Sequence, residues 1–385
     1  MSSETESILG RLIAFATVSR DSNLDLIDWC EAYLHDCGAR TERVYNAERS
    51  KANLYATLGP NDKPGIMLSG HTDVVPIDGQ DWSVPPFQLS ERDGNLYGRG
   101  TCDMKGFVAS ALNAARLAKS RTLKTPLQFA FSYDEEVGCI GVQRLIDVMQ
   151  QAPVKPQICI VGEPTSMNIA TGHKGKVALQ AHCTGRAGHS ALAPNALNAI
   201  HLATDIVQLI RSAQAKIVES GARDHAYDIP YTTLHVGIIQ AGTALNIVPH
   251  EAKLDFEIRN LACDDADSMI DNLQAECTKL VQSHRQRFPE AAIQIERRFS
   301  YPGLDTAADS QAVSLVKSLT DGNQEIKVAF GTEGGLFSQR LNIDTVICGP
   351  GSMDQGHKPD EFVSREQLNR CDAMMGRLVD YLSAN

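Results

Sequence analysis

The sequence predicts an α/β fold of two domains: one with a mainly parallel sheet flanked by helices, and an inserted, ferredoxin-like domain. Up to about residue 173, strand-like apolar runs alternate with helical segments, which is the order of βαβ units around a largely parallel sheet. From about residue 174 the order becomes βαββαβ, and the α/β alternation resumes near residue 299. We therefore expect one domain over residues 1–173 and 299–385, and an inserted domain over 174–298.

Hydrophobic spacing locates the elements of the first domain. Segment 4–16 carries apolar residues near helical spacing, and segment 23–37 repeats the pattern before Gly38, a residue type that commonly ends helices. The other expected helices span 106–118, 141–150, 309–319 and 364–382, and the expected strands span 40–45, 53–58, 66–68, 127–133, 158–161, 325–330 and 344–348.

The inserted domain is expected to contain strands and helices in the βαββαβ order. Its strands are expected at 177–183, 232–241, 246–259 and 292–299, and its helices at 196–218 and 266–283.

Composition restricts the class of protein. The chain has 385 residues, 43% of them hydrophobic, so it can bury a large core. Its net charge of −11 argues against a nucleic-acid partner, which would need a basic surface. No apolar stretch approaches a membrane span of about 20 residues, and the acidic, polar N-terminus is unlike a signal peptide. We therefore expect no membrane partner. The ten scattered cysteines form no CxxC pair, which favours reduced thiols in a cytoplasmic protein.

Acids and histidines gather where strands end and loops begin. Carboxylates at the carboxyl ends of parallel strands face the crevice in which open α/β sheets hold their ligands. Carboxylate and imidazole are ligands that suit Zn²⁺ and neighbouring divalent ions, and a shared carboxylate can hold two such ions. We therefore expect a metal site built from one set of side chains: His71, Asp103, Glu135, Glu136, Glu163 and His357.

Each part of this pattern also has a plain structural explanation. Asp73, two residues after His71, points to the same strand face and could accept the second imidazole N–H, yet a lone His-x-Asp is commonly a surface pair. Glu135 and Glu136 could form a solvated turn, or one could bind metal while the other acts as a base. The joint occurrence of these groups at successive strand ends is what favours the metal site.

Five motifs, in this order and spacing, resemble the M20 metallopeptidase family along essentially the whole chain. They are Ser69-Gly70-His71-Thr72-Asp73, the segment from Gly98 to Gly106, Asp134-Glu135-Glu136, Gly162-Glu163-Pro164-Thr165, and the loop from Gly349 to Glu361. The resemblance implies two Zn²⁺ ions per subunit, which Co²⁺ can replace. It assigns one ion to His71 and Glu163 and the other to Glu136 and His357, with Asp103 between them.

The resemblance also implies roles for other residues near the metals. Glu135 would be the general base that takes a proton from the metal-activated water and later passes one to the leaving amine. Asp73 would orient His71, and the peptide bond after Asp103 would be cis.

The inserted domain resembles the lid and dimerisation module of this family, which implies a homodimer. His189 would stabilise the tetrahedral oxyanion, or it is a turn histidine. Asn246 and Arg259 would bind the substrate α-carboxylate, for which the planar arginine fork is suited, although a strand-end arginine is often structural. Thr332 and Glu333 could contact the substrate, but Glu333 could equally brace its loop.

The expected substrate is a small N-acylated amino acid. The resemblance favours removal of acetate from N²-acetyl-L-ornithine, a step of arginine synthesis. Acetylcitrulline deacetylation, desuccinylation of succinyl-diaminopimelate and a broad aminoacylase activity stay open, because no residue is identified that reads the ornithine ammonium. An aminopeptidase and a non-catalytic metal-stabilised binding protein are the more distant alternatives; the latter is disfavoured because the base and all five ligands are present.

Overall fold

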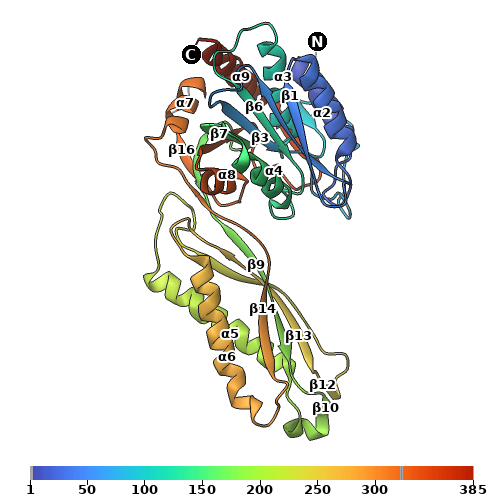
Figure 1. Ribbon diagram of the computed structural model, residues 1–385. Coiled ribbons are helices and arrows are strands. Elements are labelled where there is room, and N and C mark those ends of the chain that lie inside the picture. Colours follow the sequence, from blue (N-terminus) through green and yellow to red (C-terminus); the bar gives the residue numbers. More distant parts are fainter. Residues whose placement is uncertain (1–2, 321, 323, 385) are drawn as a thin grey trace. The chain divides into compact units, whose positions relative to one another are not determined.

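The computed structural model describes residues 3–320, 322 and 324–384, and the chain separates into two compact units (Figure 1). One unit comprises the chain up to His173, Leu304–Val328 and the chain from Thr332 onward; the other comprises Lys174–Gly303 and Ala329–Gly331. The expected end of the inserted domain, residue 298, falls inside strand β14 (Ala292–Tyr301). That strand pairs with its sheet as far as Tyr301, so the change of unit comes after the strand has ended.

The first unit is built on a mixed sheet whose centre is parallel. Its strands are β1 (Arg40–Tyr45), β2 (Ala52–Leu58), β3 (Ile66–His71), β6 (Leu127–Ser132), β7 (Ile158–Pro164), β8 (Ile169–His173), β15 (Leu304–Asp305), β16 (Glu325–Val328) and β17 (Asp344–Gly349). They run in the order β1-β2-β6-β3-β7-β17-β8-β15, and β16 pairs with β8. Because β3 is parallel to β6 and β7, and β7 is parallel to β17, these four strands end at the same edge of the sheet.

Helices cover this sheet. They are α1 (Glu4–Ile13), α2 (Leu24–Asp36), α3 (Lys105–Ala118), α4 (Ile140–Gln151), α7 (Gln311–Thr320), α8 (Gly334–Leu341) and α9 (Arg365–Ala384). Helix α3 packs against α1, α9 and strand β3, and α4 packs against α8. Glycines let α3 approach the sheet: a Cβ on Gly162 of β7 would lie 1.8 Å from the Phe107 ring. The apolar side chains of α1, α2, α3, α7 and α9 form one continuous core with those of the sheet.

The second unit is an antiparallel sheet with two helices on one face. Its elements are β9 (Lys176–Thr184), β10 (Gly188–His189), the 3-10 helix η1 (Ser190–Asn195), α5 (Ala199–Ser220), β11 (Thr233–Ala241), β12 (Ile247–Val248), β13 (Glu251–Arg259), α6 (Ala266–Arg285) and β14. The sheet order is β11-β13-β9-β14. Alternate residues of β9 are buried, which is the pattern of a strand with one face on a core, and this unit has a core of its own.

The predicted fold class is confirmed, including the βαββαβ order of β9, α5, β11, β13, α6 and β14. The sequence patterns missed β8, helix α8 and a small sheet of β4 (Ser90–Arg92), β5 (Asn95–Tyr97) and β18 (Phe362–Ser364). Among the residues described, no helix combines the length and the apolar composition that a membrane span requires.

Candidate active site

His71 is the last residue of β3. The residue before it, Gly70, faces α3, since a Cβ there would come within 3.1 Å of the Val108 side chain on that helix. Side chains alternate along a strand, so His71 points to the other face, where it is 1% exposed. Its Nδ1 lies 2.9 Å from the main-chain oxygen of Asp73. A carbonyl oxygen can only accept, so Nδ1 carries a proton and the lone pair of the neutral ring is on Nε2, where it can bind a metal ion.

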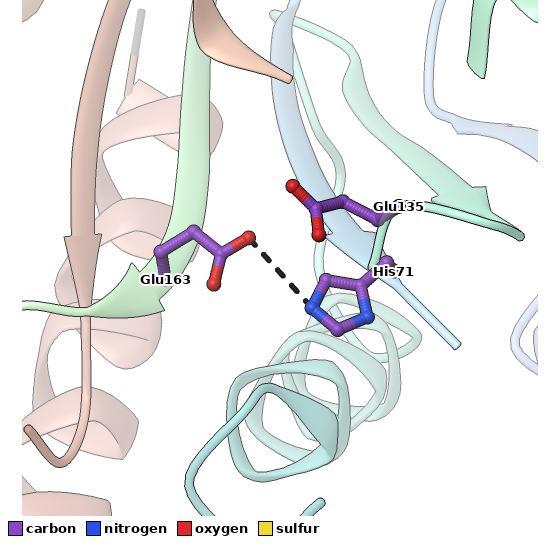
Figure 2. A group of neighbouring side chains, drawn as sticks. All are labelled: His71, Glu135 and Glu163. Carbon is purple, nitrogen blue, oxygen red and sulfur yellow. Dashed lines mark ion pairs between the residues drawn. The ribbon is translucent and has the colours of Figure 1, made fainter. Parts of the chain in front are cut away.

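Glu163 reaches the same place from the next strand, β7. Gly162 faces Phe107 of α3, and the alternation of the strand turns Glu163 to the opposite side, the side of His71. Oε1 of Glu163 lies 3.7 Å from Nε2 of His71, and both side chains are buried. Figure 2 shows the two side chains facing each other, with the Glu135 carboxylate beside them.

Asp103, in the loop before α3, has one carboxylate oxygen near each of two histidines. Its Oδ1 lies 3.0 Å from Nε2 of His71, and its Oδ2 lies 3.1 Å from Nε2 of His357. The same His357 nitrogen lies 3.0 Å from Oε2 of Glu136. Asp103 therefore joins a pair of His71 and Glu163 to a pair of Glu136 and His357. The peptide bond that follows Asp103 is cis, as the resemblance implied.

Glu135 lies close enough to the cluster to bind a metal as well. Ligand atoms of His71, Glu135 and Glu163 lie within 4.8 Å of one another, as do those of His71, Asp103 and Glu136. Distance alone therefore does not separate Glu135 from the ligands. Its Oε1 accepts a hydrogen bond from the buried thiol of Cys139, 3.3 Å away, at the start of α4. The sequence patterns did not identify Cys139, whose only signal was its nearness to the acidic motif.

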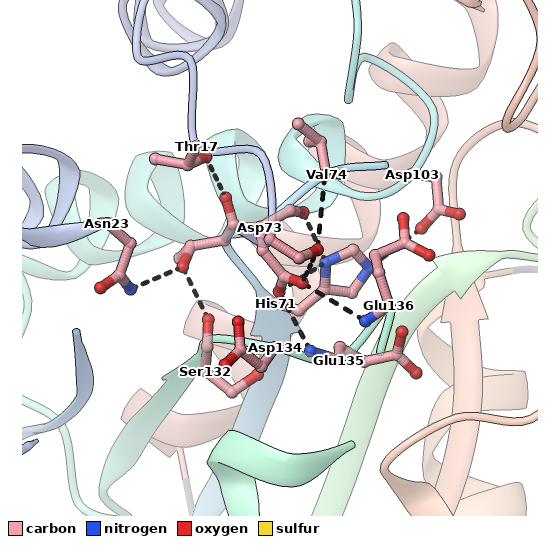
Figure 3. Close-up of polar contacts among 12 residues, drawn as sticks. Thr17, Asn23, His71, Asp73, Val74, Asp103, Ser132, Asp134, Glu135 and Glu136 are labelled. Atoms are coloured by element: carbon pink, nitrogen blue, oxygen red, sulfur yellow. Dashed lines mark hydrogen bonds and ion pairs between the residues drawn. The ribbon is translucent and has the colours of Figure 1, made fainter. Parts of the chain in front are cut away.

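The Asp73 carboxylate holds the turn that carries the two adjacent glutamates. It accepts hydrogen bonds from the main-chain N–H groups of Glu135 (3.1 Å) and Glu136 (3.3 Å), as Figure 3 shows. It also accepts one from the Ser19 hydroxyl (2.7 Å). Nδ1 of His71 is 3.6 Å from Oδ1 of Asp73. The imidazole N–H therefore donates to the main-chain oxygen of Asp73, whereas the sequence led us to expect a bond to the Asp73 carboxylate. No sequence signal pointed to Ser19.

This arrangement predicts that Asp73→Ala lowers kcat by about 10–100-fold, because the turn that presents Glu135 and Glu136 loses its acceptor. Steady-state kinetics on the metal-loaded variant would measure the change. Ser19→Ala is the matched control, since it removes one donor and leaves the carboxylate in place; its kcat is expected to fall far less. Equal kcat for Asp73→Ala and the wild type would contradict this role.

Burial and mutual repulsion make the cluster costly to keep in its fully charged form. Burial, assisted by the charges of neighbouring carboxylates, raises the pKa of Glu135 and of Glu163 well above the usual range, and raises the pKa of Glu136 to about 7. Hydrogen bonds to Asp103 and Glu136 raise the pKa of His357 to about 10. Burial would raise the pKa of Asp103, but hydrogen bonds from the two histidines lower it. Excess negative charge of this kind calls for a cation.

The residues present fit a pair of divalent metal ions. The donors are four carboxylates and two imidazoles, the ligand types of Zn²⁺ and its neighbours. Oε1 of Glu136 is buried and has no hydrogen-bond partner among the described residues, which leaves it available to a metal. The two oxygens of Asp103 are already directed to separate histidines.

The pKa shifts predict that the metal-free protein loses thermal stability as the pH rises from about 5.5 to 8. The three glutamates have folded-state pKa values above their unfolded value of about 4.3, so within this range the folded state binds more protons than the unfolded state and the free energy of unfolding falls with pH. Burial alone would lower the pKa of His71, but the hydrogen bond to Asp103 raises this pKa above its usual value. Hydrogen bonds to Asp103 and Glu136 raise the pKa of His357 in the same direction. The stabilisation from both histidines is present below about pH 6.5 and is lost at higher pH.

Melting curves of the chelator-treated protein at both pH values would test this prediction. Glu163→Gln removes one of the titrating groups and should make the dependence on pH shallower. Bound metal displaces the protons, so metal-loaded protein should not lose stability over this range. A metal-free protein whose Tm rises between the two pH values would contradict the prediction.

Three of the predicted site residues lie in the second unit. His189 ends β10 and is exposed, and its Nδ1 accepts a hydrogen bond from the main-chain N–H of Ala191, 3.2 Å away. Asn246 is also exposed and adjoins this segment, because its main-chain oxygen accepts from the N–H of Ser190, 3.0 Å away. Arg259 ends β13 and is partly buried, with Nε 3.0 Å from Glu257 and Nη1 3.1 Å from the Tyr301 hydroxyl.

The remaining two predicted residues are buried in the first unit. Thr332 is fully buried, and its hydroxyl accepts from the main-chain N–H of Gly334 at the start of α8. Glu333 is 1% exposed, with Oε2 3.3 Å from the Ser69 hydroxyl, and burial raises its pKa to about 7. In this conformation neither side chain is accessible, and both brace the loop before α8.

The fold and the His–carboxylate cluster at the ends of its parallel strands define a metal-dependent hydrolase. The chain belongs to peptidase family M20/M25/M40, whose family model matches residues 67–381.

Known proteins similar to this chain agree with that assignment. It is 34% identical over 378 residues to the acetylornithine deacetylase of Pasteurella multocida (strain Pm70), an alignment that covers 96% of this chain and 95% of the other. An M20 family metallo-carboxypeptidase from Sulfolobus solfataricus, Sso-CP2, has a similar structure, with a TM-score of 0.79 at 17% identity over the whole of both chains. A dinuclear metal-binding M20 peptidase of Bacillus subtilis has a TM-score of 0.70 at 14% identity, over 99% of this chain and 98% of that one. The two structures share the fold with this chain.

Proposed function

We propose that this protein hydrolyses N²-acetyl-L-ornithine to acetate and L-ornithine. The observation that carries the proposal is the position of Asp103, with one carboxylate oxygen near each of two histidines, beside the buried Glu163 and the partly buried Glu135 and Glu136. The substrate name comes from the acetylornithine deacetylase of Pasteurella multocida, which is similar along nearly all of its length.

Two metal ions would be held by the five side chains of the cluster. His71 and Glu163 would bind one ion, Glu136 and His357 the other, and Asp103 both. We propose Zn²⁺, with Co²⁺ as a substitute; the dinuclear centre of the Bacillus subtilis relative supports the number of ions. When bound, the ions would lower the pKa of a water molecule and polarise the acetyl carbonyl.

The side chains of this protein would then manage the protons and the orientation of the substrate. The Glu135 carboxylate would take a proton from the attacking water and return one to the α-amine as the amide C–N bond breaks. The Glu135 side chain is partly buried, and burial disfavours its charged form, which favours uptake of a proton during this exchange. Asp73 would keep Glu135 in place through the main-chain N–H.

The second unit would act as a lid and dimerisation module, from about residue 174 to 298. His189 would stabilise the oxyanion with its ring N–H, and Asn246 and Arg259 would bind the α-carboxylate of the substrate. For Thr332 and Glu333, both buried, we propose an indirect contribution through the position of their loop.

A homodimer would use the free edge of the sheet in the second unit. Strand β11 is an edge strand, and Ile238 and Ile239 on it are about half exposed, at 52% and 49%. An exposed edge strand with apolar side chains is a template for pairing with another chain. Light scattering coupled to size-exclusion chromatography should give twice the chain mass of 41.9 kDa, and Ile238→Lys should reduce it to that of the monomer.

Parallel measurements of kcat/KM on four substrates would test the proposed activity. The substrates are N²-acetylornithine, N²-acetylcitrulline, N-acetylmethionine and N-succinyl-diaminopimelate. We expect acetylornithine to be preferred by at least tenfold, about 1.4 kcal/mol in transition-state binding. A flat profile, or preference for another substrate, would overturn the proposed substrate and leave the hydrolase chemistry standing.

A further inference from the structure

The Glu361 carboxylate lies beneath the loop that carries Asp103. Its Oε1 accepts hydrogen bonds from the main-chain N–H groups of Cys102 (2.9 Å) and Asp103 (3.0 Å), and its Oε2 accepts from that of Gly100 (3.0 Å). Its main-chain oxygen accepts from the N–H of Gly98, 2.9 Å away. Glu361 is 1% exposed. One buried side chain thus binds three of the four residues from Gly100 to Asp103.

Arg99 balances the charge of this carboxylate. Its Nη1 lies 2.6 Å from Oε2 of Glu361, and the arginine is fully buried. Its Nη2 donates to Oε1 of Gln80, 2.5 Å away, and the guanidinium lies over the Trp82 ring. The pair is held on several sides, so the carboxylate has little freedom to move.

The same network reaches His357. Gln80 donates from Nε2 to the main-chain oxygen of His357, 3.2 Å away, and Nη1 of Arg99 lies 3.3 Å from that of Lys358. Glu361 follows His357 by four residues in one loop. The network therefore links the main chain of Asp103 to that of His357, whose ring nitrogen lies next to Oδ2 of Asp103.

We propose that Glu361 is a positioning residue that fixes the main chain of Asp103, and through Arg99 and Gln80 that of His357, so that the two can share a metal ion. The inference rests on the proposed metal-binding role of Asp103 and His357. Only a carboxylate suits the position, because every group that faces it is a donor and a carboxylate is purely an acceptor. A glutamine would turn an NH₂ group toward main-chain N–H groups or toward the guanidinium.

Co²⁺ binding would test the proposal without any substrate. Isothermal titration of metal-free protein with Co²⁺ gives the number of ions and their affinities, and the visible absorption of bound Co²⁺ reports its coordination. For Glu361→Gln we expect affinity at one of the two sites to fall about 10–100-fold, with an altered absorption spectrum. Glu361→Asp keeps an acceptor-only group and should recover part of the affinity.

The matched control is Glu31→Gln, which breaks another glutamate–arginine contact, with Arg43 at 2.7 Å, in α2 and β1. It should bind Co²⁺ like the wild type. If Glu361→Gln does not fold, Gln80→Leu provides the test. It removes a partner of Arg99 and the donor to His357, and should weaken Co²⁺ binding by a smaller factor.

Unchanged Co²⁺ affinity and spectrum in Glu361→Gln, or in Gln80→Leu if that is the variant that folds, would overturn this inference alone. A wild-type protein that binds no metal would instead overturn the proposed function as well. Equal loss of affinity in Glu31→Gln would show a general effect of lost stability and would also contradict the positioning role.

Discussion

Replacement of Glu135 by glutamine is expected to lower kcat by about 10²- to 10⁴-fold while the protein keeps its full complement of bound metal. Glutamine preserves the shape of the side chain but cannot take up and return a proton. The loss corresponds to about 3–5 kcal/mol in the activation barrier. The hydrogen bond from the main-chain N–H of residue 135 to Asp73 does not involve the side chain, so the turn should stay in place. Single-turnover kinetics and elemental analysis on the same sample would measure both quantities.

The adjacent glutamate is a close control. Glu136→Gln makes the same chemical change one residue away, at a carboxylate whose Oε2 is 3.0 Å from His357. This variant should lose metal as well as turnover. If Glu135→Gln also loses metal, Glu135 is a ligand, as its distance to His71 and Glu163 allows. Wild-type turnover in Glu135→Gln would contradict its assignment as the base.

Asp103→Asn is expected to have the second large effect, the loss of at least one of the two bound ions together with nearly all turnover. An amide offers one oxygen and one NH₂ group, so it cannot present an acceptor to both histidines as Oδ1 and Oδ2 of the aspartate do. His357→Ala removes a contact of only one half of the site, and it should keep one ion. Metal content of the purified variants, after dialysis against a metal-free buffer, is the measurement.

Asp354→Asn makes the same substitution at an exposed aspartate in the loop that carries His357, and it should bind two ions. Two tightly bound ions in Asp103→Asn would contradict the shared role of Asp103. So would full metal content in His357→Ala, which would exclude that histidine as a ligand.

Much of the fold followed from local sequence patterns. The parallel core strands β3 and β7 begin with short continuous apolar runs, and β9 has apolar residues at every second position, so both classes of strand were predicted. Helix α8 was missed because it is short and begins with two glycines, which read as a loop. The strands β4 and β5 have only three residues each and pair as a local hairpin, which gives too short an apolar pattern to detect. Strand β18 pairs with β5 across more than 250 residues, and local patterns carry no signal for that pairing.

The composition of the site followed from where acids and histidines stand at strand ends, because the carboxyl ends of parallel strands meet. The supporting contacts did not. His71 donates a hydrogen bond to the main-chain oxygen of Asp73, and because every residue has a main-chain oxygen, the residue types do not predict this contact. The burial of Glu333 behind Ser69 likewise depends on how α8 packs. Glu361 was visible only as the end of a motif, and its bonds to the Asp103 loop came from the structure.

The most direct test of the metal centre is anomalous diffraction from crystals of the Zn²⁺-loaded protein. We expect two anomalous peaks in the first unit, about 3.5–4 Å apart, with Oδ1 of Asp103 next to one and Oδ2 next to the other. His71 and Glu163 should contact the first peak, and Glu136 and His357 the second. A single peak, or two peaks of which Asp103 contacts only one, would contradict the shared carboxylate on which the proposed chemistry depends.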